Sequence, residues 1–183
     1  SVSAYLGALG ASLGAMVANL SSHKRGWDDR WKEFSDVAER GQTVMEELLA
    51  LVDEDTESFN RIMAVFSMPK GTEEEKAVRA EALEKATLYA AQVPLKTMKA
   101  ASKAFPLLKE MALKGNPASA SDAGVGALAA TAAVRGASLN VRINAASLRD
   151  RSLADSLTGE ASSLVEAALA AEKEILELTD KNI

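Results

Sequence analysis

A cluster of acidic residues lies in LVDEDTESFNRIM, residues 51–63, and a carboxylate kept partly away from water can donate or accept a proton. The cluster comprises Asp53, Glu54, Asp55 and Glu57. Apolar residues recur here at helical spacing, so the direction of each carboxylate follows from about 100° per residue measured from Val52. Asp55 lies at about −60°, inside the apolar stripe, and Asp53 lies at its margin. Glu54 and Glu57 face away from the stripe.

Two interpretations of the inward-facing Asp55 remain open. A carboxylate in an apolar setting usually takes up a proton or finds a partner, so Asp55 could form an internal salt bridge or cap a neighbouring helix. The alternative is a general acid/base at the edge of a cleft. Structural ion pairs perturb pKa values as well, so burial alone does not choose between the two.

A second group of polar residues lies between residues 116 and 150, where Asn140 and Asn144 interrupt a nearly apolar helix. Asp122 precedes Asn140 by five helical turns, so the two share a direction, and the small Ala129, Ala133 and Gly136 lie between them. This pattern predicts a shallow groove that suits a flat ligand with amide-like edges. The alternative is structural: Asp122 or Ser121 caps the helix, and the asparagines hydrogen-bond across a core.

The composition narrows the chemistry. The 183 residues suit one domain, 1–183, and include no Cys and one His. Disulfides, a thiol nucleophile and Cys–zinc sites are therefore excluded, and neither a Ser-His-Asp triad nor a metal site is expected. A net charge of −5 and an aromatic content of 4% argue against a nucleic-acid partner.

The elements that must position these side chains are all helical. Helices are predicted at about 2–21, 35–66, 73–104, 105–115, 123–148 and 158–179, with a turn at NPASASD before the fifth. Thr72 and Glu75 form a capping-box pattern, Pro94 is expected to kink or split its helix, and RDRSLADSLTG is expected to be a connection. The predicted fold is an all-α bundle of about six helices.

The first helix is rich in Ala and Gly, and we expect it to be central. Residues 1–20 are apolar enough to suggest a membrane span, but small and polar residues are too frequent, and no basic leader precedes them. A buried helix that lets its neighbours approach closely is the better interpretation. We therefore expect a cytoplasmic protein with no membrane partner.

Several segments, in their order and spacing, resemble the cyclodeaminase family: the C-terminal domain of formiminotransferase-cyclodeaminase and its stand-alone bacterial relatives, some named methenyltetrahydrofolate cyclohydrolase. These segments are SVSAYLGALGASLGAMVANL, LVDEDTESFNRIM, MPKGTEEEKAVR, VPL, GNPASASD and GASLNVRIN. The resemblance implies an all-α fold that forms a homodimer or a higher homo-oligomer. It also implies closure of 5-formimidoyltetrahydrofolate to 5,10-methenyltetrahydrofolate with loss of ammonia, and no cofactor beyond the folate substrate.

The family motifs match individual residues of this chain. The acidic helix motif falls on Asp53, Asp55 and Phe59, and the loop-to-helix motif on Asn116, Ser121 and Asp122. The late-helix motif falls on Asn140 and Asn144, and the turn motif on Pro69 and Lys70. We expect Asp55 to be the acid/base group, with Asp122 as the other catalytic candidate, and the remaining motif residues except Pro69 to bind substrate. Lys70 either meets the glutamate tail of the folate or is an exposed turn lysine.

Two rival functions remain at this stage. In a methenyltetrahydrofolate cyclohydrolase, water opens the same ring instead of ammonia leaving. A non-catalytic helical assembly module would also account for the acidic charge and the Ala-rich core.

Overall fold

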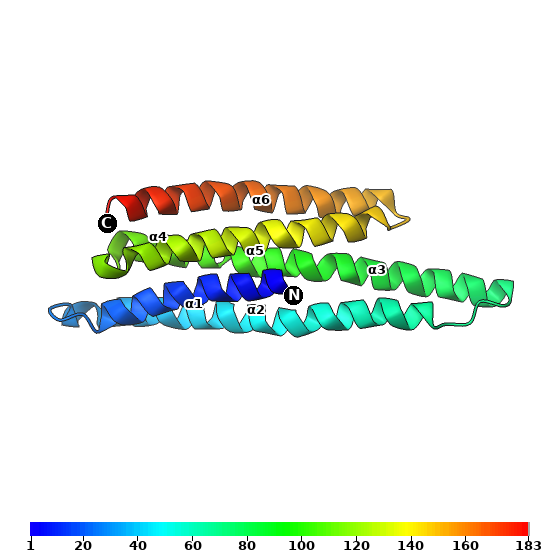
Figure 1. Ribbon diagram of the computed structural model, residues 1–183, viewed down its shortest axis with the longest axis horizontal. Helices are drawn as coiled ribbons and strands as arrows, with labels where there is room; N and C mark the ends of the chain where they lie inside the picture. Colours follow the sequence, from blue (N-terminus) through cyan, green and yellow to red (C-terminus); the bar gives the residue numbers. More distant parts are fainter. Residues whose placement is uncertain (183) are drawn as a thin grey trace.

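The computed structural model describes residues 1–182, and its regular elements are all helical over that range. The six α-helices are α1 (Val2–Ser22), α2 (Trp31–Phe66), α3 (Glu73–Ser102), α4 (Ala104–Lys114), α5 (Ala120–Ala146) and α6 (Arg151–Asp180). Short 3₁₀ turns, Asp28–Arg30 and Pro117–Ser119, precede α2 and α5. The helices pack lengthwise into one elongated bundle, which confirms the all-α prediction (Figure 1).

Local sequence signals set most of the helix starts. Thr72 and Glu75 form the predicted capping box at the start of α3, with each side chain accepting a hydrogen bond from the other residue's backbone N–H. The prediction that RDRSLADSLTG is a connection was wrong, because α6 begins at Arg151. Asp150 caps it by accepting a hydrogen bond from the Leu153 N–H at 3.0 Å. The polar residues that suggested a loop lie on the solvent-facing side of the first two turns of α6.

Pro94 was expected to kink or split its helix, and the split does not occur. Helix α3 continues through this residue to Ser102, and the proline is buried. A proline inside a helix removes one hydrogen-bond donor, so the carbonyl of Ala90, four residues earlier, needs another partner.

Helix α1 lies between α2 and α5 and packs closely on both. At Gly10 the approach to α5 is so close that a Cβ placed there would lie 2.8 Å from the carbonyl oxygen of Gly126. By length and a mean hydropathy of 1.3, α1 could cross a membrane, but half of its apolar window is buried inside this bundle. The predicted central Ala/Gly-rich helix is thus confirmed as an element of the core.

Helix α1 is much shorter than its neighbour α2, with 21 residues against 36. Its N-terminus lies partway along the bundle, and α2 and α3 continue well beyond it (Figure 1). The apolar stripe of α2 therefore has two environments. Val44 and Leu48 are buried, whereas Phe59, Met63 and Phe66 are exposed, with Phe59 61% accessible. The apolar stripe of α2 is therefore core along only part of its length.

Candidate active site

A groove opens between α2 and α5 where α1 begins. The backbone nitrogen of Ser1 lies 3.8 Å from an Asp55 carboxylate oxygen on α2. A Cβ placed at Gly136 on α5 would lie 2.7 Å from the Ser3 hydroxyl oxygen. The first residues of α1 thus separate Asp55 from Gly136. Beyond them α3, which packs on both α2 and α5, forms the floor. We call this space the α2–α5 groove.

The walls of the groove follow from helical spacing. On α2, Asp55, Phe59, Ile62 and Phe66 succeed one another at three or four residues, so they share one side of the helix. On α5, Gly136, Asn140, Asn144 and Ser147 do the same. Farther from α1 the groove deepens into a cavity of about 380 Å³, a size typical of small-molecule sites. Its lining consists of Ile62, Phe66, Ala80, Leu83, Glu84, Thr87, Asn144, Ser147 and Arg149.

Asp55 lies at the α1 end of this groove with 34% of its side chain exposed. Across residues 1–182, no Lys or Arg side chain forms an ion pair with it. The amino group of Ser1 lies 3.8 Å from the carboxylate, which is within ion-pair distance but longer than a hydrogen bond. Ser58 is buried beside it and donates a hydrogen bond from its hydroxyl to the Asp55 backbone carbonyl at 2.8 Å, not to the carboxylate. The carboxylate is therefore placed at the groove without being locked to a side-chain cation.

The neighbouring acids of α2 have other surroundings. Asp53 and Glu57 are exposed, in agreement with their predicted directions. Glu54 was expected to face solvent but is partly buried against α3, where it accepts hydrogen bonds from the Lys96 ammonium and the Tyr89 hydroxyl. The hydrogen bond from Lys96 lowers the pKa of Glu54, and burial opposes that effect only in part. Glu54 therefore stays ionised and ties α2 to α3 behind Asp55.

The two asparagines of α5 lie on the opposite wall. Asn144 lines the cavity, and its Nδ2 donates a hydrogen bond to the Ala90 carbonyl of α3 at 2.7 Å. Asn140 is exposed one turn closer to the start of α1. Of the predicted residues, Asn144 lines the cavity itself, and helical spacing places Asp55 and Phe59 on the same side of α2, and Asn140 on the same side of α5, as the cavity lining.

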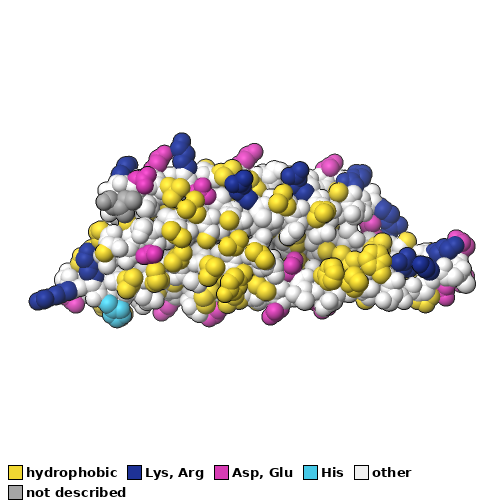
Figure 2. All heavy atoms as spheres, in the orientation of Figure 1, with side chains coloured by type: hydrophobic (Ala, Val, Ile, Leu, Met, Phe, Trp, Pro, Cys, Tyr) yellow, Lys and Arg dark blue, Asp and Glu magenta, His cyan; other side chains and the backbone are white. Residues whose placement is uncertain are grey.

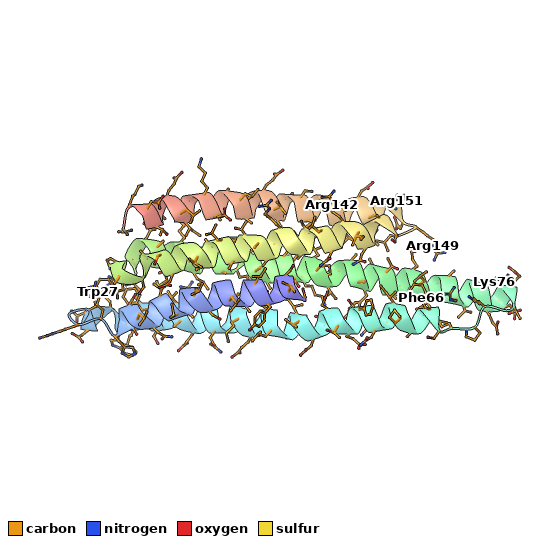
Figure 3. The ribbon with its side chains drawn as sticks, viewed as in Figure 1. Trp27, Phe66, Lys76, Arg142, Arg149 and Arg151 are labelled. Carbon is orange, nitrogen blue, oxygen red and sulfur yellow. The ribbon has the colours of Figure 1, made fainter. Side chains whose placement is uncertain are left out.

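Sequence reasoning missed the ion pair at the far end of the cavity. Glu84 on α3 accepts hydrogen bonds from the Arg149 backbone N–H at 2.9 Å and from its guanidinium at 3.1 Å. Burial alone would raise the pKa of Glu84, but these hydrogen bonds keep it below the ordinary value. The partners are far apart in sequence, so no local motif indicates the pair. Figure 3 shows Arg149 beyond the end of α5, at the same end of the bundle as Phe66.

The remaining predicted residues lie elsewhere. Asn116 accepts a hydrogen bond from the Ala118 N–H at 3.2 Å, and its own backbone N–H donates to the Ser21 hydroxyl at 2.8 Å, as expected of a structural cap. Ser121 and Asp122 begin α5, and Asp122 is about 27 Å along the helix from Asn140. Lys70 is exposed in the turn between α2 and α3.

In residues 1–182, most of the groove predicted on the small residues of α5 is occupied, and only its end near Asn140 and Asn144 stays open. Helix α1 fills the rest, with Gly10 packed on Gly126 and Ala130. The correction has a simple cause: a strip of Ala and Gly receives a helix as readily as a ligand, and the sequence does not say which. In residues 1–182, no three His, Cys, Asp or Glu side chains are grouped to hold a metal ion.

Known proteins match the chain along most of its length. The family model described as Formiminotransferase-cyclodeaminase matches residues 1–163. The chain belongs to this family. It is 34% identical to a methenyltetrahydrofolate cyclohydrolase from Methylorubrum extorquens, over 97% of this chain and 85% of that protein. It is 33% identical to formimidoyltransferase-cyclodeaminase from Gallus gallus, over 99% of this chain but 34% of that protein.

The mouse formimidoyltransferase-cyclodeaminase is also 33% identical, over 92% of this chain and 31% of its own length. The chain therefore spans about a third of these longer relatives. Among solved structures, formiminotetrahydrofolate cyclodeaminase from Thermotoga maritima superimposes with a TM-score of 0.84 at 24% identity, over 98% of this chain and 86% of that one. At that identity the likeness establishes the fold.

Proposed function

We propose that the protein closes 5-formimidoyltetrahydrofolate to 5,10-methenyltetrahydrofolate and releases ammonia. The observation that carries the proposal is the position of Asp55, a one-third-exposed carboxylate that pairs with no Lys or Arg within residues 1–182, at a groove whose other wall presents the amides of Asn140 and Asn144. The family relationship supports a folate substrate, because its relatives are named for folate reactions.

The reaction needs orientation and one mobile proton. N10 attacks the formimidoyl carbon attached to N5, so the N10–C bond forms and a tetrahedral centre results. The formimidoyl group reacts as its amidinium form, so the departing NH2 gains the one proton that N10 loses and leaves as NH3. The C–N bond to that nitrogen breaks, and the carbon becomes the methenyl cation. Nucleophile and electrophile belong to one bound molecule, so proximity comes from binding the folate in a bent form. Asp55 accepts the proton at N10 and returns it to the leaving nitrogen.

The rest of the groove provides binding contacts. Phe59 and Phe66 expose ring faces on the α2 wall, which suit the flat pteridine and benzoyl rings. Asn140 and Asn144 face them from α5 and hydrogen-bond the amide edge of the pterin. Lys70 lies in the turn just after α2 and meets the carboxylates of the glutamate tail.

A second candidate reaction is hydrolysis of methenyltetrahydrofolate, which the relative from Methylorubrum extorquens favours. Both reactions pass through a tetrahedral carbon between N5 and N10. That carbon carries the departing amine in the deaminase reaction and a hydroxyl from water in the hydrolase reaction. The test is to incubate purified protein with each substrate and follow methenyl-folate absorbance. A rise from the formimidoyl compound supports the deaminase. A fall from methenyl-folate, faster than the blank and without the first activity, supports the hydrolase instead.

We also propose that two copies pair through the outer face of α1. Val2, Tyr5, Leu9, Met16 and Leu20 are exposed along one side of this helix, and hydrophobic side chains gather over this face of the bundle (Figure 2). Together they form an exposed apolar stripe along α1, and apolar surface of this kind often marks a protein–protein contact. A stable dimer buries about 800 Å² per partner, so the contact would include the margins of the stripe on α2 and α5 as well.

Light scattering tests the pairing. The wild-type chain should have the mass of a dimer, and Leu9→Glu should shift it to the monomer. Leu169→Glu on α6 is the matched control, because Leu169 is 42% exposed and Leu9 is 45% exposed. A monomeric wild type would refute the pairing. No thermal stabilisation by saturating folinic acid would favour the non-catalytic assembly module.

A further inference from the structure

Pro94 leaves a backbone carbonyl without its helical partner. In an unbroken helix the carbonyl of Ala90 would accept a hydrogen bond from the N–H of residue 94, and proline has none. Ala90 is 5% exposed, so water has little access to satisfy it. A buried carbonyl without a partner is costly, so another donor is expected nearby.

That donor is the side chain of Asn144, whose Nδ2 lies 2.7 Å from the Ala90 oxygen. A carbonyl oxygen only accepts, so the amide nitrogen, not the amide oxygen, must face it. The contact therefore fixes which way round the amide of Asn144 is held. Within the part of the chain that the structure describes, its Oδ1 accepts no hydrogen bond, and the side chain lines the cavity.

We propose that Pro94 is a positioning residue for the ligand: by freeing the Ala90 carbonyl, it holds Asn144 with its oxygen available to hydrogen-bond the donor edge of a bound heterocycle. The identification of that heterocycle as a pteridine rests on the proposed function. The orientation of the amide does not, because it follows from the two hydrogen-bonding groups and the missing N–H.

Replacement of Pro94 by Ala restores the helical N–H. The Ala90 carbonyl then has a partner along its own helix and competes less strongly for Asn144, although its second lone pair weakens the contact instead of abolishing it. We expect the amide of Asn144 to sample both orientations. Ligands that need its oxygen should bind about 3–10-fold more weakly, whereas kcat, which depends on Asp55, should change less than about twofold.

The first measurement uses the ligand-free protein. In the wild type, one Asn144 side-chain N–H proton should be shifted downfield and protected from exchange, as expected of a short hydrogen bond. Pro94→Ala should move this signal towards the position of a solvated amide. Pro106→Ala is the matched control, because Pro106 lies in the first turn of α4, where backbone N–H groups have no helical partner in any case. An unchanged Asn144 signal in Pro94→Ala would overturn the proposal.

The second measurement is a double-mutant cycle on binding of folinic acid. Pro94→Ala should weaken binding when Asn144 is present and have no further effect in an Asn144→Ala background. A purely structural role of Pro94 would weaken binding equally in both backgrounds, which would contradict the proposal. A shifted amide signal in a protein that binds no folate would support the orientation of Asn144 and refute the proposed function.

Discussion

Replacement of Asp55 by Asn is the most direct test of the chemistry, because it removes the proton-carrying group and keeps its shape. The side chain forms no side-chain ion pair in the described chain and is one-third exposed, so little stability should depend on it. Loss of a general acid/base typically lowers turnover by about 10²–10⁴-fold, or about 3–5 kcal/mol of transition-state stabilisation. Binding should change little, because the amide still fits the groove.

The assay follows formation of methenyl-folate under single-turnover conditions, which report the chemical step, together with folinic acid binding and the thermal midpoint. Glu57→Gln is the matched control: it is the same kind of change two residues away, on an exposed side chain paired with Arg61 at 3.1 Å. It should leave turnover unchanged. If Asp55→Asn retains more than about a tenth of wild-type turnover with a folded protein, Asp55 is not the proton carrier.

Three further predictions concern stability, each measured by urea unfolding. Because folding lowers the pKa of Glu54, its contribution to stability is complete above the ordinary carboxyl pKa and is lost as the pH falls through the folded-state pKa. Glu54→Gln should therefore reduce the free energy of unfolding by about 1 kcal/mol or less at pH 7 and leave it unchanged near pH 2. An equal cost at both pH values would show that charge is not involved. Gly10→Ala should destabilise the fold by about 1–3 kcal/mol, because the new Cβ would meet the Gly126 carbonyl, whereas Gly159→Ala, with nothing within 4 Å, should stabilise α6 by up to about 1 kcal/mol. Thr131 has a buried hydroxyl without a hydrogen-bond partner within residues 1–182, so Thr131→Val should stabilise by about 1 kcal/mol, and a loss would indicate an unseen partner such as a bound water.

Much of the helical layout was predictable because its causes are local. Capping residues, apolar periodicity and the Gly after α4 act within a few residues, and they gave the ends of α1 and α4 and the start of α3 within a residue or so. The two exceptions have different explanations, one local and one tertiary. The start of α6 was missed because a solvated helix face has the same composition as a loop, and Pro94 failed to split α3 because Asn144 satisfies the carbonyl it leaves free.

The candidate site was only partly predictable. The inward direction of Asp55 and the shared face of Asn140 and Asn144 follow from helical spacing, so the sequence alone could indicate them. The pairing of Glu84 with Arg149 joins residues that are distant in the chain, and the displacement of Asp122 from the groove depends on where α1 ends. Neither the ion pair nor the distance of Asp122 from the groove produces a periodic pattern in the sequence.

By itself, the sequence determined that this protein is helical, that its first helix is built for close packing, and that one acid of α2 turns inward. Only the tertiary structure decided what that acid faces. Helix α1 covers small residues of α5, and the apolar stripe of α2 is buried at Val44 and Leu48 but exposed at Phe59, Met63 and Phe66. The physical reason is that periodicity fixes the direction of a side chain about its own helix axis, whereas burial depends on the length and placement of a neighbouring helix.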